Sequence, residues 1–185
     1  MRNAAVVSFL FFSLAGISTF HAQPTQVNIT APGIKWLSWE NAIEKCKMQK
    51  RKLLVDVYTD WCGWCKRMDR STFENPGIVT YINSHYYPIK FNAESKQDIE
   101  FNGKTYKFVK NGMRGYHELA AEITRGRLSY PTIVFLNEDL EVIQPIPGFK
   151  NVTEFEQIIT YFGRDEHKKT PWEVYKRNYK PMKGN

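Results

Sequence analysis

Apolar and polar residues follow one another in short blocks that predict helices and strands in turn. In the segment 39–46, apolar residues recur at helical spacing on one side, so an amphipathic helix is expected. The run 53–58 is apolar apart from Asp56, as in a strand buried on both faces. The pattern then predicts a helix over 62–68 and a further helix over 76–82, opened by a proline at its first position.

The second half of the chain continues the pattern with three strands and a helix. The segment 86–91 is expected to be a second parallel strand, and 130–136 and 140–145 a third and a fourth. A closing helix is predicted over 152–162. Together these elements predict an α/β fold with a central mixed sheet flanked by helices.

The stretch 95–115 is longer than such a layered fold needs. Within it, 99–108 alternates around an Asn-Gly pair, which predicts a hairpin, and a helix is expected over 116–123. Ligands of open parallel sheets bind beyond the carboxyl ends of the strands, and the insertion follows the end of 86–91. The hairpin should therefore emerge at the edge that carries Cys62 and select partners there; a purely decorative surface hairpin is the alternative.

Both ends of the chain differ from the middle. Residues 1–22 form a secretory signal in outline, because their apolar core is too short for a permanent membrane span. Cleavage is expected after Ala22 or after Ser18, followed by a leader up to residue 37. The mature protein is then exported to the periplasm or the extracellular space, without stable membrane insertion; an uncleaved membrane tether is the alternative.

The mature chain has the length of one domain, which we place at 38–163 and follow with a basic, aromatic tail at 164–185. In the tail, Trp172, Tyr175 and Tyr179 share one helical face and are expected to pack on the domain.

The net charge of +7 does not by itself indicate a nucleic-acid partner, because basic and acidic residues are mixed along the chain. Hydrophobic residues make up 42% and aromatic residues 15%, as in a packed globular protein. The histidines lack ligand spacing to one another or to the cysteines, so neither a metal site nor a cofactor is predicted.

The three cysteines divide into one structural and two chemical residues. Cys46 lies on the apolar side of the first helix and is expected to be a core thiol, with a role as resolving or partner-bonding cysteine as the alternative. Cys62 and Cys65 are three positions apart, and a bridge across so short a loop restrains the unfolded chain little. Disulfide exchange, in contrast, needs an attacking thiolate with a second thiol close behind it.

The sequence DVYTDWCGWCK at 56–66 resembles the active-site segment of the thioredoxin superfamily. The Tyr-Pro-Thr segment at 130–132 resembles its cis-proline loop, Gly148 its glycine before the last helix, and 90–92 its lysine-bearing strand. These motifs occur in the family's order between about residues 36 and 162, which makes them far more specific than a Cys-x-x-Cys motif alone.

The export signal and the segment 71–76 are most similar to envelope members of the superfamily, such as the C-terminal domain of the membrane thiol:disulfide interchange reductant. Two features depart from the family pattern. The cysteines enclose Gly63 and Trp64 instead of Gly-Pro, Gly-His or Pro-His, so the redox direction cannot be transferred, and the insertion at 95–115 has no thioredoxin counterpart.

The resemblance implies a thioredoxin fold in which Cys62 is the nucleophile and Cys65 resolves the mixed disulfide. It also implies that a buried Asp56 takes the proton from Cys65 and that Lys90 tunes this carboxylate. A solvent-facing Asp56 at a frayed strand edge and a lysine that merely ends a strand are the alternatives. The remaining candidates would contact substrate, namely Trp61, Gly63, Trp64, Tyr130 and Pro131. For Trp64 the alternative is a ring that folds back onto its helix. For Pro131 the alternative is an ordinary trans proline.

These residues predict an exported thiol:disulfide oxidoreductase that acts on protein or peptide disulfides and receives electrons from an upstream thiol donor. A reductase is favoured because no histidine lies between the cysteines to stabilise the thiolate strongly. An oxidant or isomerase of secreted proteins is the second hypothesis, and a redox-inactive binding module with the same fold is the third.

Overall fold

The computed structural model describes Met1 and residues 33–182. The predicted signal and most of the leader fall in residues 2–32, outside the described residues.

A four-stranded mixed sheet forms the centre of the molecule, in the order β2-β1-β7-β8. The central strand β1 pairs in parallel with β2 and antiparallel with β7, and β7 pairs antiparallel with β8. This arrangement confirms the predicted sheet and its parallel pair. The strands are β1 (Lys52–Tyr58), β2 (Tyr86–Asn92), β7 (Thr132–Leu136) and β8 (Val142–Pro147).

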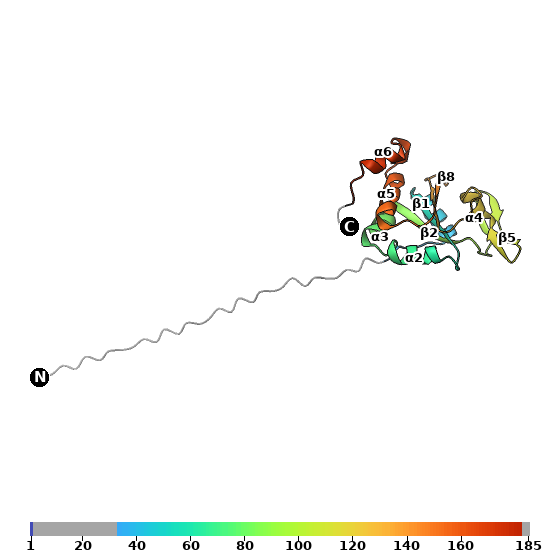
Figure 1. Ribbon diagram of the computed structural model, residues 1–185, viewed down its shortest axis with the longest axis horizontal. Coiled ribbons are helices and arrows are strands. Elements are labelled where there is room, and N and C mark those ends of the chain that lie inside the picture. Colours follow the sequence, from blue (N-terminus) through green and yellow to red (C-terminus); the bar gives the residue numbers. More distant parts are fainter. Residues whose placement is uncertain (2–32, 183–185) are drawn as a thin grey trace.

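Helices cover both faces of the sheet (Figure 1). On one face α1 and α4 enclose a core that includes the buried Cys46, which confirms its expected place. On the other face α2, α3 and α5 pack around Phe135 and Phe155. The helices are α1 (Trp39–Met48), α2 (Gly63–Ser71), α3 (Pro76–His85), α4 (Glu118–Ile123) and α5 (Val152–Gly163).

The insertion contains two hairpins, whereas the sequence predicted one. The first pairs β3 (Ile99–Phe101) with β4 (Lys104–Tyr106) around the expected Asn-Gly turn. The second pairs β5 (Phe108–Asn111) with β6 (Arg114–His117), and Gly112 at its turn has a φ of 60°. A glycine with positive φ at the first turn position suits a two-residue hairpin loop. The residues around Gly112 lack the alternation of apolar and polar residues from which the first hairpin was predicted.

Several predicted boundaries were wrong, and the third strand begins at Thr132 instead of Tyr130. The expected helix over 116–123 begins only at Glu118, because Tyr116 pairs with Val109 in the second hairpin. The fourth strand begins at Val142 instead of Leu140, since Leu140 has a φ of 67° in the turn after β7.

The tail packs against α5, as predicted (Figure 1). It forms a short 3-10 turn, η1 (Glu166–Lys168), and the helix α6 (Trp172–Arg177). The rings of Trp172 and Tyr175 lie 5.1 and 5.0 Å from the Tyr161 ring. The Tyr179 hydroxyl donates a 2.6 Å hydrogen bond to the buried Glu156.

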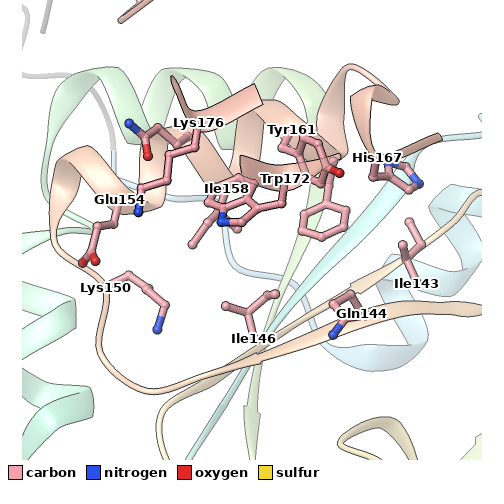
Figure 2. A pocket seen from close by; sticks show the side chains of 12 residues that line it. Ile143, Gln144, Ile146, Lys150, Glu154, Ile158, Tyr161, His167, Trp172 and Lys176 are labelled. Atoms are coloured by element: carbon pink, nitrogen blue, oxygen red, sulfur yellow. The ribbon is translucent and has the colours of Figure 1, made fainter. Parts of the chain in front are cut away.

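A cavity of about 610 Å³ remains between β8, α5 and the tail (Figure 2). It is lined mainly by apolar side chains, among them Ile146, Ile158 and Trp172, and neither Cys62 nor Cys65 contributes to it. This cavity is therefore separate from the cysteine pair.

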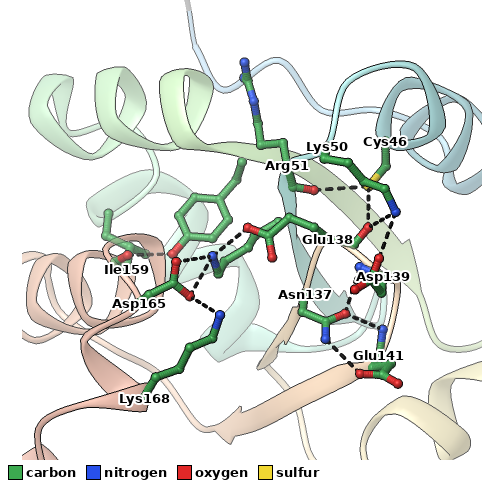
Figure 3. A network of polar contacts seen from close by, with 12 residues as sticks. Cys46, Lys50, Arg51, Asn137, Glu138, Asp139, Glu141, Ile159, Asp165 and Lys168 are labelled. Atoms are coloured by element: carbon green, nitrogen blue, oxygen red, sulfur yellow. Dashed lines mark hydrogen bonds and ion pairs between the residues drawn. The ribbon is translucent and has the colours of Figure 1, made fainter.

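A buried cation joins the tail to the start of the central strand, and Figure 3 labels its two acidic partners, Glu138 and Asp165. The side chain of Lys52 is only 4% exposed, and its Nζ lies 2.7 Å from Glu138 Oε1 and 3.0 Å from Asp165. Burial opposes ionisation of Asp165, but hydrogen bonds from Lys168 and Lys52 outweigh it and lower the pKa of this carboxyl. Asp165 therefore remains an ionised partner of Lys52 at neutral pH.

We expect loss of the buried cation to destabilise the protein much less than loss of its two carboxylate partners. Lys52→Met replaces the cation by an apolar chain of similar length, and should change the free energy of unfolding by less than about 1 kcal/mol because both carboxylates are partly exposed. The double variant Glu138→Gln/Asp165→Asn leaves the cation buried without an anion and should cost about 3 to 5 kcal/mol. Urea unfolding at pH 7 compares the two; equal costs would contradict this account.

Candidate active site

Cys62 and Cys65 are joined by a disulfide at the start of α2, with an S–S distance of 2.08 Å. Cys62 is the N-cap residue of this helix, and its Sγ accepts a 3.0 Å hydrogen bond from the backbone N–H of Cys65. Cys65 lies in the first turn and is 2% exposed, against 5% for Cys62. Once the pair is reduced, a thiolate at Cys62 would meet both the helix dipole and this N–H donor.

The proline loop has the geometry that the family resemblance implied. The Tyr130–Pro131 bond is cis, and Pro131 is buried. Its carbonyl accepts a 2.7 Å hydrogen bond from the backbone N–H of Gly148, whose φ of 83° favours glycine. The ring of Tyr130 meets that of Trp61 edge-on at 5.8 Å, so this loop lies beside the residue that precedes Cys62.

Asp56 is buried in the centre of the sheet, which excludes the alternative of a frayed edge. It is 1% exposed and pairs across β1 and β2 with Lys90, whose Nζ lies 2.6 Å from Oδ2. The other carboxylate oxygen, Oδ1, is buried without a hydrogen-bond partner. Burial raises the pKa of Asp56 to about 6, although the charge of Lys90 acts in the opposite direction. A carboxylate with this pKa exchanges protons readily near neutral pH.

Lys90 connects Asp56 with a second carboxylate that the sequence analysis did not single out. Its Nζ also contacts Asp69 on α2, and it lies 5.0 Å from the ring centre of Tyr58. Burial lowers the pKa of Lys90, but Asp56 and Asp69 together outweigh it and raise the value. Asp69 follows Cys65 by four residues on a helix, so the i,i+4 spacing was a signal that could have revealed it.

The two tryptophans beside Cys62 are both half-exposed. Trp61 is 51% exposed, and its indole N–H donates a 3.1 Å hydrogen bond to Glu94 Oε2. Trp64 is 55% exposed and rests against Phe149 at 5.5 Å, so it both faces solvent and packs on the domain. Gly63 is exposed, and a Cβ at this position would meet no atom within 4 Å. Close packing therefore does not require glycine between the cysteines.

The second hairpin reaches the cysteine site, in agreement with the expected direction of the insertion. Arg114 on β6 lies over the Trp61 ring, with its guanidinium carbon 4.3 Å from the ring centre. This contact was not predicted, because the hairpin that places Arg114 had no clear sequence signal.

Within the described residues, no group of three or more His, Cys, Asp or Glu side chains is arranged to hold a metal ion. In the same part of the chain, no helix has the length and apolar character needed to cross a membrane.

Comparison with known proteins defines the family. The family model described as a thioredoxin-like domain matches residues 39–163. This chain belongs to the thioredoxin-like domain family. The match confirms the predicted thioredoxin-like α/β fold, and in this thioredoxin-like protein Cys62 and Cys65 of the Cys-x-x-Cys motif form a disulfide.

Two relatives match parts of the thioredoxin-like chain. An uncharacterized protein of Caenorhabditis elegans, B0495.5, is 25% identical over 136 residues, which cover 73% of this chain and 15% of that protein. The protein disulfide-isomerase C17H9.14c of Schizosaccharomyces pombe is 33% identical over 90 residues, which cover 49% of this chain and 19% of that protein. The chain thus spans less than a fifth of the length of either relative.

Solved structures share the thioredoxin-like fold. A thioredoxin-fold protein from Helicobacter pylori has a TM-score of 0.55 at 20% identity, covering 69% of this chain and 83% of its own. A DsbH oxidoreductase has a TM-score of 0.52 at 14% identity, with coverages of 83% and 95%. A putative disulphide-isomerase from Bacteroides thetaiotaomicron has a TM-score of 0.50 at 24% identity, with coverages of 72% and 94%.

The raised pKa of Asp56 predicts a stability that depends on pH. Because the folded pKa of about 6 exceeds the ordinary 3.8, the folded state holds the proton more tightly. The corresponding stabilisation is complete below about pH 4 and is lost as the pH rises through 6. Asp56→Asn imitates the protonated carboxyl and leaves Lys90 paired with Asp69, so it should raise the free energy of unfolding at pH 7 by about 2 to 3 kcal/mol.

Denaturant unfolding of the oxidised protein at pH 4 and pH 7 measures this effect. Asp60→Asn, which changes an exposed carboxylate beside the site, is the matched control and should show no such pH-dependent gain. If Asp56→Asn does not raise the free energy of unfolding at pH 7, or raises it equally at pH 4 and pH 7, the raised pKa of Asp56 is refuted.

Proposed function

We propose that this protein is an exported reductase of protein disulfides. The observation that carries the proposal is a Cys-x-x-Cys disulfide at a helix start, combined with a buried carboxylate whose pKa of about 6 suits proton transfer. The predicted secretory signal supports the cellular site, which we place in the periplasm or the extracellular space. Protein or peptide disulfides are the substrates, and an upstream dithiol protein is the electron donor.

The reaction proceeds in two exchanges. The Cys62 thiolate attacks one sulfur of the substrate disulfide, which forms a mixed disulfide and releases one substrate thiolate. Asp56 then takes the proton from Cys65, and the new thiolate attacks Cys62 Sγ. This second step re-forms the Cys62–Cys65 disulfide and releases the other substrate thiolate, so two electrons pass to the substrate. The upstream donor reduces the pair again by the same chemistry.

The other site residues have supporting roles in this proposal. Lys90 tunes Asp56 through its 2.6 Å contact. Trp61, Trp64 and Tyr130 present ring surface to the substrate, and Gly63 leaves room above the helix start. The buried cis Pro131 has no N–H, which leaves the backbone of Tyr130 to pair with an extended substrate strand.

Reduction is favoured over oxidation because Gly63 and Trp64 supply no positive charge between the cysteines. A strongly oxidising pair needs such stabilisation of its thiolate. The second candidate is an isomerase of secreted proteins. The similarity to the Schizosaccharomyces pombe protein disulfide-isomerase favours it, although that match covers 49% of this chain.

A redox titration with an activity assay tests the proposal. The purified protein should reduce insulin with dithiothreitol as donor, and Cys62→Ser should abolish this reduction while the fold is retained. Equilibration with glutathione should give a potential below about −220 mV, whereas a value near −120 mV would indicate an oxidant. A folded protein without insulin reduction would support the redox-inactive binding module and overturn the enzyme.

The role of Asp56 predicts a selective kinetic defect. Asp56→Asn should slow the resolution of a preformed mixed disulfide by about 100-fold, the low end of a general-base contribution, with much less effect on the first attack by Cys62. Stopped-flow measurement of the two steps with a peptide disulfide separates them. Asp60→Asn should leave both rates unchanged, and equal slowing of both steps by Asp56→Asn would argue against a proton-transfer role.

A further inference from the structure

The tryptophans that precede Cys62 and Cys65 each have an arginine side chain over the ring. Arg114 from the second hairpin lies over Trp61 at 4.3 Å, and Arg67 from α2 lies over Trp64 at 5.1 Å. Arg67 also lies 5.3 Å from the ring centre of Phe149, which packs on Trp64. The indole faces hold both guanidinium groups beside the two tryptophans.

Neither arginine is neutralised within the described part of the chain. The salt bridges found there include no contact to Arg67 or Arg114, and both residues are exposed. A guanidinium group that is fixed in position but has no anion is well suited to bind a carboxylate from another molecule, with two parallel hydrogen bonds.

The carboxylates near the site are engaged with other partners. Asp60 Oδ2 accepts a hydrogen bond from Asn92, Glu94 Oε2 accepts one from Trp61, and Asp69 pairs with Lys90. The hairpin that carries Arg114 has no acidic residue. The helix α2 and the second hairpin, which present the two arginines, are therefore net basic and favour an anionic partner.

We propose that Arg67 and Arg114 are specificity residues that select acidic polypeptide segments around the substrate disulfide. This proposal rests on the proposed reductase function and identifies its substrate class. The tryptophan faces contact the apolar parts of an extended segment, while the two guanidinium groups bind Asp or Glu side chains close to its cysteine. Met113, which is fully exposed at the hairpin tip beside Arg114, adds an adaptable apolar contact.

The test compares two peptide disulfides that are identical except for the residues near each cysteine, Glu in one and Gln in the other. The wild-type protein should reduce the Glu peptide with a kcat/KM about five- to tenfold higher, mainly through a lower KM. Arg114→Gln and Arg67→Gln should each lower this ratio by about two- to fivefold, the size expected for an exposed ion pair. The preference should shrink in 0.5 M NaCl, because salt screens exposed charges.

Lys110→Gln removes the same charge from the same hairpin without a tryptophan contact, and it should preserve the ratio. Arg114→Lys keeps the charge but cannot donate two parallel hydrogen bonds, so its ratio should lie between those of the wild type and Arg114→Gln. A wild-type ratio near one, or an equal loss in Lys110→Gln and Arg114→Gln, would overturn the proposal.

Hydroxyethyl disulfide, which is small and uncharged, distinguishes a failure of the substrate-class proposal from a failure of the reductase function. Its reduction without a preference between the peptides would overturn the substrate class alone. If neither this compound nor either peptide is reduced, the reductase function itself fails, and the specificity proposal fails with it.

Discussion

The burial of one carboxylate in the central strand is the constraint on which the site depends. Asp56 and Lys90 are direct partners across β1 and β2, so the register of the parallel pair places a cation against the buried anion. Lys90 offsets only part of the desolvation cost of the charged carboxylate, so the pKa of Asp56 remains raised. The charged carboxylate therefore lowers the free energy of unfolding of the protein at neutral pH. In the proposed mechanism this carboxyl, with its pKa near neutrality, takes the proton from Cys65.

The same strand carries a second buried charge, and the contrast explains the difference in their roles. Lys52 at the start of β1 contacts two carboxylates, and these tie the tail and the β7–β8 turn to the sheet. Asp56 has one oxygen bound to Lys90 and the other without a partner. A fully paired charge holds elements together, whereas a partly paired one retains the capacity to exchange a proton. The two buried charges of this strand thus differ in how completely they are paired.

The surface of the site is assembled from segments that lie far apart in the sequence. Trp61 meets the ring of Tyr130 from the proline loop and the guanidinium of Arg114 from the insertion, and Trp64 meets Phe149 from the segment before α5. The family core contributes the reactive pair, and the insertion contributes a cation on the face of one of its tryptophans. Variation in the inserted hairpin can therefore alter what the site binds without moving the cysteines.

The sequence by itself determined the sheet, the main helices, the cysteine pair at a helix start and the buried Asp56, because each depends on local periodicity or on a motif of fixed spacing. Only the tertiary structure revealed the second hairpin, the contact of Arg114 with Trp61, and the sharing of Lys90 between Asp56 and Asp69. These features depend on which side chains meet after distant segments pack together. Pattern along a chain specifies the faces of each element but not the partners that those faces acquire.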